Sequence, residues 1–86
     1  MLKARLYLSL GLFVQVYRND QFDTTNLVLV HNGRRVYGRD QLGGSWHRHP
    51  IDDPAGHDFS EEGGRSVSLS EFLDEVEAIL SELELP

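Results

Sequence analysis

The chain has 86 residues, carries a formal net charge of −6 and contains no cysteine. This length allows one small domain, so residues 1–86 are expected to share a single core. The lack of cysteine excludes disulfides, thiolate metal ligands and a cysteine nucleophile. No apolar run reaches the roughly 18 residues of a membrane span, and no secretion signal is evident, so we expect a cytoplasmic protein with no membrane partner.

The charge is divided unevenly along the chain. Residues 1–50 carry seven basic and three acidic side chains, a net charge of +4. Residues 51–86 carry one basic and eleven acidic side chains, a net charge of −10. Acidic runs commonly form the solvated face of a helix, whereas a basic half can face an anion such as nucleic acid.

The first half of the chain predicts strands. Residues 2–8 alternate apolar and polar side chains, which predicts a half-buried strand with one apolar face. That face would carry Leu2, Ala4, Leu6 and Leu8. Residues 12–17 are rich in β-branched and aromatic side chains and predict a second strand.

A hairpin is predicted around Asn32-Gly33, which separates strand-like residues 27–31 and 34–39. An Asn-Gly pair favours a two-residue type I′ turn, because both positions need a positive φ. That turn would pair His31 with Arg34 and Leu29 with Val36. The outer face would then display a row formed by Arg35, Tyr37 and Arg39.

Residues 40–66 contain five of the eight glycines, two prolines and three of the four histidines. They predict a histidine-rich loop, in which residues 47–49 could form one short strand. Residues 67–85 predict a helix with one apolar stripe. Its start is marked by Ser68 and Glu71, which fit a capping box. The expected fold is therefore an α+β domain. A four-stranded, mainly antiparallel β-meander (residues 1–39) would carry the C-terminal helix on one face.

The side chains best suited to catalysis or binding lie in the histidine-rich loop and beside it. In a strand, His47 and His49 would point to the same face. Two neighbouring imidazoles could serve as base and acid, with Asp40 orienting one of them, in RNA cleavage that needs no cofactor. Arginines would stabilise charge on the phosphate. The candidates to hold substrate are Arg35, Tyr37, Arg39, Trp46 and Arg48.

Two alternatives remain open for the same residues. His47, His49 and His57, with Asp58 or Asp40, could bind zinc or another divalent transition metal. Alternatively, the histidines are structural and the chain is a non-enzymatic protein-interaction module.

The pattern resembles the TumE-like toxins of prokaryotic toxin–antitoxin pairs. The resemblance rests on the segment Val36 to Asp40, on Trp46-His47-x-His49-Pro50, on His57 and on the closing helix. It implies a growth-inhibiting protein that is neutralised by a cognate antitoxin and plausibly acts on RNA, with His47, His49 and Asp40 as its site residues. We also expect a homodimer, since small β domains often cover an edge strand by pairing.

Overall fold

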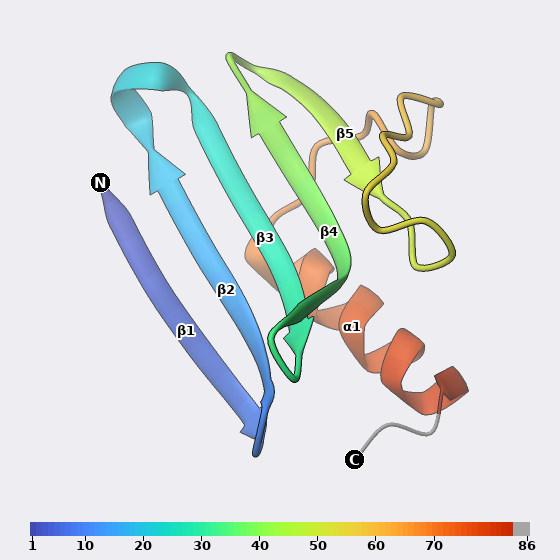
Figure 1. The fold of residues 1–86 in the computed structure, drawn as a ribbon. Coiled ribbons are helices and arrows are strands. Elements are labelled where there is room, and N and C mark those ends of the chain that lie inside the picture. Colours follow the sequence, from blue (N-terminus) through green and yellow to red (C-terminus); the bar gives the residue numbers. More distant parts are fainter. Residues whose placement is uncertain (84–86) are drawn as a thin grey trace.

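The structure, a computed structural model, describes residues 1–83 and shows an α+β fold (Figure 1). An open antiparallel sheet of five strands is followed by one C-terminal helix. In chain order the elements are β1 (Leu2–Ser9), β2 (Leu12–Asn19), the 3₁₀ turn η1 (Asp20–Phe22), β3 (Thr24–His31), β4 (Arg34–Leu42), β5 (Ser45–His49) and α1 (Leu69–Leu83). The strands lie in sequence order, so each pairs with its neighbour in the chain.

Two tight turns define the second half of the sheet. Asn32 and Gly33 have φ values of 51° and 80°, which confirms the predicted turn with two left-handed positions. Gly43 and Gly44 have φ values of 58° and 85° and make a second two-residue turn between β4 and β5. The prediction of four strands is therefore wrong, because residues 40–49 continue the sheet instead of belonging to a loop.

A β-bulge in β4 changes which side chains face the helix. Val30 pairs with Arg35, as the Asn-Gly turn predicts, but Leu29 pairs with Tyr37. Val36 is consequently an extra residue on β4. Because successive side chains of a strand point to opposite faces, one extra residue exchanges the faces beyond it.

The predicted outer row is wrong for two of its three members. Beyond the bulge, Tyr37 and Arg39 share the face of Leu29 and are only 6% and 0% exposed. Arg35 lies before the bulge, on the opposite face, and is exposed. A bulge has no reliable sequence signal, so a prediction from simple alternation assigns the residues beyond it to the wrong face of the sheet.

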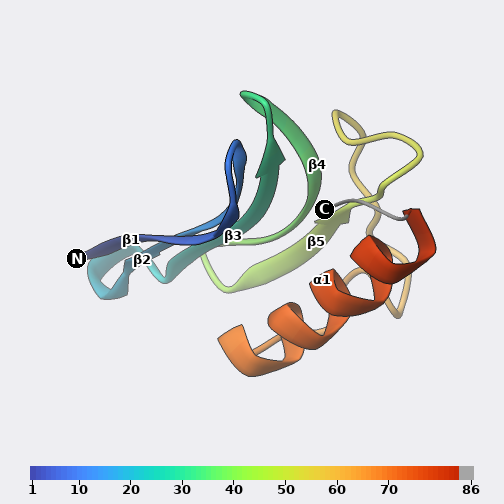
Figure 2. The same cartoon turned by 90° about the horizontal axis from the view of Figure 1, so that it is seen from below.

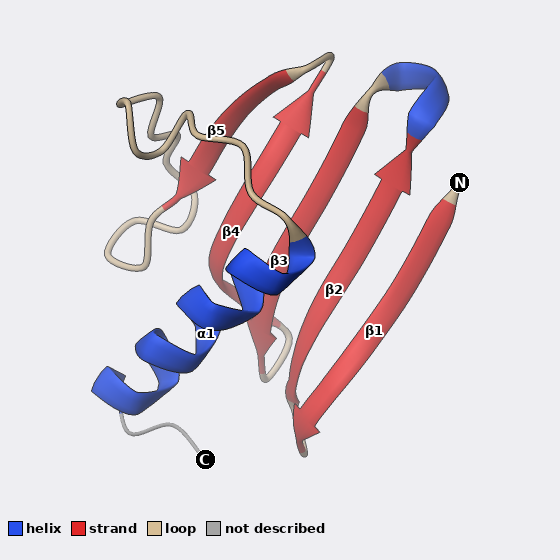
Figure 3. Cartoon of the chain, turned by 180° about the vertical axis from the view of Figure 1, so that it is seen from behind, coloured by secondary structure: helices blue, strands red, loops and turns tan. Residues whose placement is uncertain are grey.

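The core lies between the sheet and α1. Figures 2 and 3 show a twisted sheet with the helix on one side only, where it crosses β3 and β4. The buried apolar side chains of this cluster are Leu12, Val14, Val16, Leu27, Leu29, Tyr37, Phe72 and Val76. The helix leaves β1 uncovered: Ala4 packs against the core, whereas Leu2, Leu6 and Leu8 are 55%, 38% and 45% exposed.

The helix begins at Leu69, directly after its cap. Ser68 Oγ accepts from the backbone N–H of Glu71 at 3.1 Å, and Glu71 Oε1 accepts from the backbone N–H of Ser68 at 2.9 Å. This reciprocal pair confirms the predicted capping box. Val67 and Ser68 precede the helix. The end of the predicted range, residues 84 and 85, lies outside the described residues.

Candidate metal centre

Strand β5 places two histidines on the face of the sheet that is opposite α1. His47 pairs with Asp40 on β4, and His49 pairs with Gly38. Positions 47 and 49 share one face because the period of a strand is two. A Cβ on Gly38 would meet the backbone oxygen of Leu27 at 3.3 Å and the ring of His49 at 3.7 Å, so the tight approach at this position is to the neighbouring strand β3.

A short bridge brings the third histidine to the same face. Arg48 and Asp58 form an antiparallel pair with two backbone hydrogen bonds of 3.0 and 2.8 Å. In this extended segment Asp58 shares the face of Arg48, and its neighbours His57 and Phe59 point to the opposite face. The ring centroids of His47 and His57 are 4.9 Å apart, and Phe59 packs 5.3 Å from His47.

The ligand atoms of the three histidines lie close together, and Asp40 lies beside two of them. His47 Nε2 lies 3.2 Å from His49 Nε2, and Asp40 Oδ2 lies 3.0 Å from His49 Nε2 and 3.7 Å from His47 Nε2. His57 contributes a ring nitrogen, and the ligand atoms of the three histidines all lie within 4.8 Å of one another. Tetrahedral zinc with bonds of about 2.0–2.1 Å separates its ligand atoms by about 3.3 Å.

Three of the four residues of the centre are buried and poorly supplied with hydrogen-bond donors, whereas His57 is exposed. Asp40, His47 and His49 are 6%, 4% and 4% exposed. Asp40 Oδ1 and His49 Nδ1 are buried and have no hydrogen-bond partner. A buried carboxylate is costly unless a cation or several donors compensate its charge. The side chains of the cluster therefore have more lone pairs that can accept a hydrogen bond than N–H protons that they can donate.

Desolvation lowers the pKa of His47, because it outweighs the attraction of the Asp40 carboxylate. The other contributions, from His49, His57 and Arg35, also favour the neutral ring. A neutral imidazole is the form that binds a metal ion.

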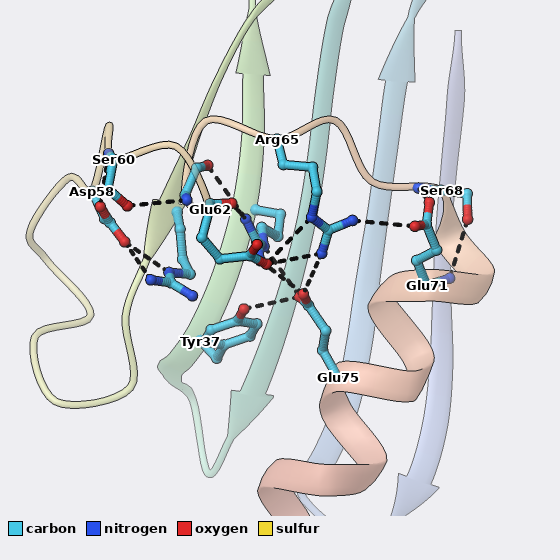
Figure 4. Close-up of polar contacts among 11 residues, drawn as sticks. Tyr37, Asp58, Ser60, Glu62, Arg65, Ser68, Glu71 and Glu75 are labelled. Carbon is cyan, nitrogen blue, oxygen red and sulfur yellow. Dashed lines mark hydrogen bonds and ion pairs between the residues drawn. The ribbon is translucent and has the colours of Figure 1, made fainter.

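Two of the predicted substrate-binding residues lie on the helix side of the sheet. Tyr37 donates to Glu75 Oε1 at 2.8 Å (Figure 4). Arg39 donates to the two carboxylate oxygens of Glu75 at 3.1 and 2.7 Å, and to the carbonyl oxygen of Glu62 at 2.7 Å. Burial acts to lower the pKa of Arg39, but the hydrogen bond and charge of Glu75 together with the interactions of Tyr37 outweigh it, and the pKa is raised. This arginine anchors α1 and the preceding segment to the sheet.

Arg48 and Trp46 also face the helix side, and Arg35 faces the histidines. Arg48 donates from Nε to Asp58 Oδ2 at 2.9 Å. Hydrogen bonds from Ser60 and Arg48 lower the pKa of Asp58 to about 2. Trp46 is half-buried two residues before Arg48 and shares its face. Among the five predicted substrate-binding residues, only Arg35 lies on the face of the histidine cluster.

The structure thus brings His47, His49 and His57 together, places Asp40 beside His47 and His49, and directs Asp58 away from them. Of the two carboxylates considered as metal ligands, Asp40 is the one that joins the histidines. Phe59, which covers His47 and His57, was not identified from the sequence. The sequence signal that could have identified Phe59 is the alternation His57-Asp58-Phe59. Such an alternation after a strand allows one more extended segment to pair with the sheet.

Comparisons with protein-family models, curated proteins and solved structures found no match for this chain. The resemblance to TumE-like toxins therefore stays a prediction, and function is inferred from the site. Among the described residues, no helix is long and apolar enough to cross a membrane.

Proposed function

We propose that the chain is a small metal-binding domain in which His47, His49, His57 and Asp40 hold a zinc ion or another divalent transition-metal ion. The observation that carries this proposal is the convergence of Asp40 Oδ2 with two imidazole nitrogens at 3.0–3.7 Å in a buried position. Nitrogen and carboxylate ligands at such separations suit zinc.

The set of ligands favours a structural role for the ion. Asp40 Oδ2 lies near His47 and His49, so together with the three histidines it would supply the four ligands of a closed tetrahedral zinc site, with no open position for substrate. They come from β4, from β5 and from the bridge at residues 57–59. The ion would join a segment without regular secondary structure to the last strand of a small sheet. Metal binding is a common source of stability in domains that have little core of their own.

The geometry supports a metal-independent ribonuclease less well. A general acid and base must reach the substrate. The side chains of His47 and His49 are each 5% exposed and their Nε2 atoms face each other. Arg39 and Arg48, expected to hold phosphate, lie on the other face with carboxylate partners. The toxin-like role with a cognate antitoxin remains a hypothesis that rests on the resemblance alone.

Metal content tests the proposal. The chain is purified without a polyhistidine tag, stripped with a chelator, dialysed against zinc and analysed for bound metal, with about one ion per chain expected. At a free metal concentration of about 100 times Kd, binding stabilises the fold by about 2.7 kcal/mol. For a domain of this size that raises Tm by roughly 11–22 °C. A chelator should reverse the shift.

Single-histidine variants provide the control. His47→Ala and His49→Ala should lose both the ion and the rise in Tm. His31→Ala should retain both, because His31 lies at the end of β3 beside Arg34 and outside the cluster. Cobalt should give the intense visible absorption of a tetrahedral site in the wild-type chain and in His31→Ala. Metal content well below one ion per chain, or equal metal binding by all variants, would show that the histidines and Asp40 form only a hydrogen-bonded cluster.

A further inference from the structure

The first three strands carry a second polar surface on the face opposite α1, which we call the open face. Figure 1 views the sheet from this side. The register places Lys3 beside Tyr17, and Tyr17 beside Asn26. The neighbouring rows place Arg5 beside Gln15 and Tyr7 beside Phe13. These seven residues form the open face, and none of them is a ligand of the proposed metal centre.

Cations and aromatic rings alternate on the open face. The Lys3 ammonium lies 6.0 Å from the centroid of the Tyr17 ring, and the Arg5 guanidinium lies 4.8 Å from that of Phe13. Tyr7 stands against Phe13 with ring centroids 5.2 Å apart, and it is 65% exposed. Rings held in place by neighbouring strands lose little entropy when a flat ligand stacks on them.

An open groove of about 610 Å³ runs through the open face. Its lining includes Lys3, Arg5, Gln15, Tyr17 and Asn26. Asn26 Oδ1 is buried at this groove and has no hydrogen-bond partner. A buried acceptor without a donor is energetically costly, so a ligand that brings an N–H or O–H group gains from meeting it.

The charge of this face differs from that of the whole chain. Lys3, Arg5 and Arg35 all point to the side of the sheet opposite α1, and Asp40, in the proposed metal centre, is the only carboxylate that the described strands place on that side. The carboxylates that pair with Arg39, Arg48 and Arg65 lie on the helix side. The face is therefore basic although the chain as a whole is acidic.

We infer that the open face binds single-stranded nucleic acid. Two or three bases would stack on Tyr7, Phe13 and Tyr17, as bases do on the aromatic side chains of other sheet surfaces. Lys3 and Arg5 would swing from the rings to the phosphates. Once the Asn26 side chain turns toward the groove, a base N–H or a ribose hydroxyl would donate to its carbonyl oxygen, which has no partner in the structure. The metal centre would not take part in this binding.

The observations favour a single strand over other anionic ligands. A duplex hides the faces of its bases, so it could use the cations but not the rings. An acidic protein segment could also pair with the cations, but it brings no flat ring for each aromatic side chain. The cations, the aromatic rings and the unpaired acceptor together fit unstacked nucleotides best.

Fluorescence anisotropy with a labelled oligouridine of about 12 nucleotides tests this inference. We expect saturable binding at about 50 mM salt, and at least roughly tenfold weaker binding to a duplex of the same length. Lys3→Glu/Arg5→Glu should weaken binding more than tenfold. It should also reduce the slope of log affinity against log salt concentration by the amount expected for the loss of about one to two phosphate contacts. Arg34→Glu is compared with the single variants Lys3→Glu and Arg5→Glu, since each changes the net charge equally and Arg34 is exposed on the helix side of the hairpin.

Ring variants separate stacking from charge. Tyr17→Leu should weaken binding roughly tenfold, whereas Tyr17→Phe keeps the ring and should bind like the wild-type chain. Circular dichroism and Tm confirm that each variant is folded. His47→Ala, where it remains folded, should bind RNA as the wild-type chain does, which separates this surface from the metal centre. Absence of saturable binding, equal affinity for the duplex, or equal loss in Arg34→Glu and in the single variants Lys3→Glu and Arg5→Glu would overturn the inference.

Discussion

Replacing Glu75 by glutamine tests the ion pair that joins α1 to the sheet. The side chain of Arg39 is 0% exposed, and both oxygens of Glu75 accept from it at 3.1 and 2.7 Å. Glutamine keeps one acceptor and removes the compensating charge. Removing one partner of a buried pair typically costs about 3–5 kcal/mol. The carboxylate of Glu62, 3.2 Å from Arg39, remains, so we expect about 3 kcal/mol.

That loss is large for so small a domain, whose unfolding free energy is expected to be roughly 4–13 kcal/mol. Urea denaturation followed by far-ultraviolet circular dichroism, at fixed zinc concentration, measures it. Glu77→Gln is the matched control on an exposed site of the same helix and should change stability by less than about 0.5 kcal/mol. Adding Arg39→Met to Glu75→Gln should recover part of the loss, because no charge is then left unpaired. A cost below about 1 kcal/mol for Glu75→Gln, or strictly additive effects, would refute this account of the pair.

Three further variants test other parts of the fold. Phe72→Ala should lower the unfolding free energy by about 3–5 kcal/mol, since Phe72 is 0% exposed in the core; a loss under about 1 kcal/mol in urea denaturation would contradict its central place. Gly33→Ala should cost about 1–2 kcal/mol from strain at φ +80° alone, because a Cβ there meets nothing within 4 Å; an unchanged Tm would contradict this. Hydrogen bonds from Ser68 lower the pKa of Glu71 below its ordinary 4.5, so this stabilisation is present above pH 4.5 and lost as the pH falls through the lowered pKa. The stability gap between the wild-type chain and Glu71→Gln should therefore be larger at about pH 7 than at about pH 3, and an equal gap in denaturant titrations would exclude the effect.

Local chemistry made several elements of this fold predictable. The Asn32-Gly33 turn and the capping box at Ser68 and Glu71 each depend on residues close together in the chain, and both are confirmed. The Gly43-Gly44 turn carries the same kind of signal, since Gly-Gly also favours a two-residue hairpin turn. Without that turn, the short strand expected at residues 47–49 stayed inside a loop and was not joined to β4.

The arrangement across the sheet could not be predicted in the same way. Whether Arg39 faces water or the helix depends on one extra residue, Val36, and on carboxylates 23 and 36 positions further along the chain. His47 and His49 could be paired from their spacing, because a strand fixes their common face. The approach of His57 depends on a bridge between Arg48 and Asp58, which no local pattern specifies.

The order of the strands has a consequence for how the chain folds. Each strand pairs with its predecessor, so every hairpin closes a short loop and costs little entropy, which favours fast assembly. Only α1 must return across a long segment to the sheet. Until it does, the surface that will become the core contains the charged end of Arg39, which stays hydrated. Docking of the helix is therefore the step that withdraws this charge from water, and Glu75 arrives with the helix to compensate it.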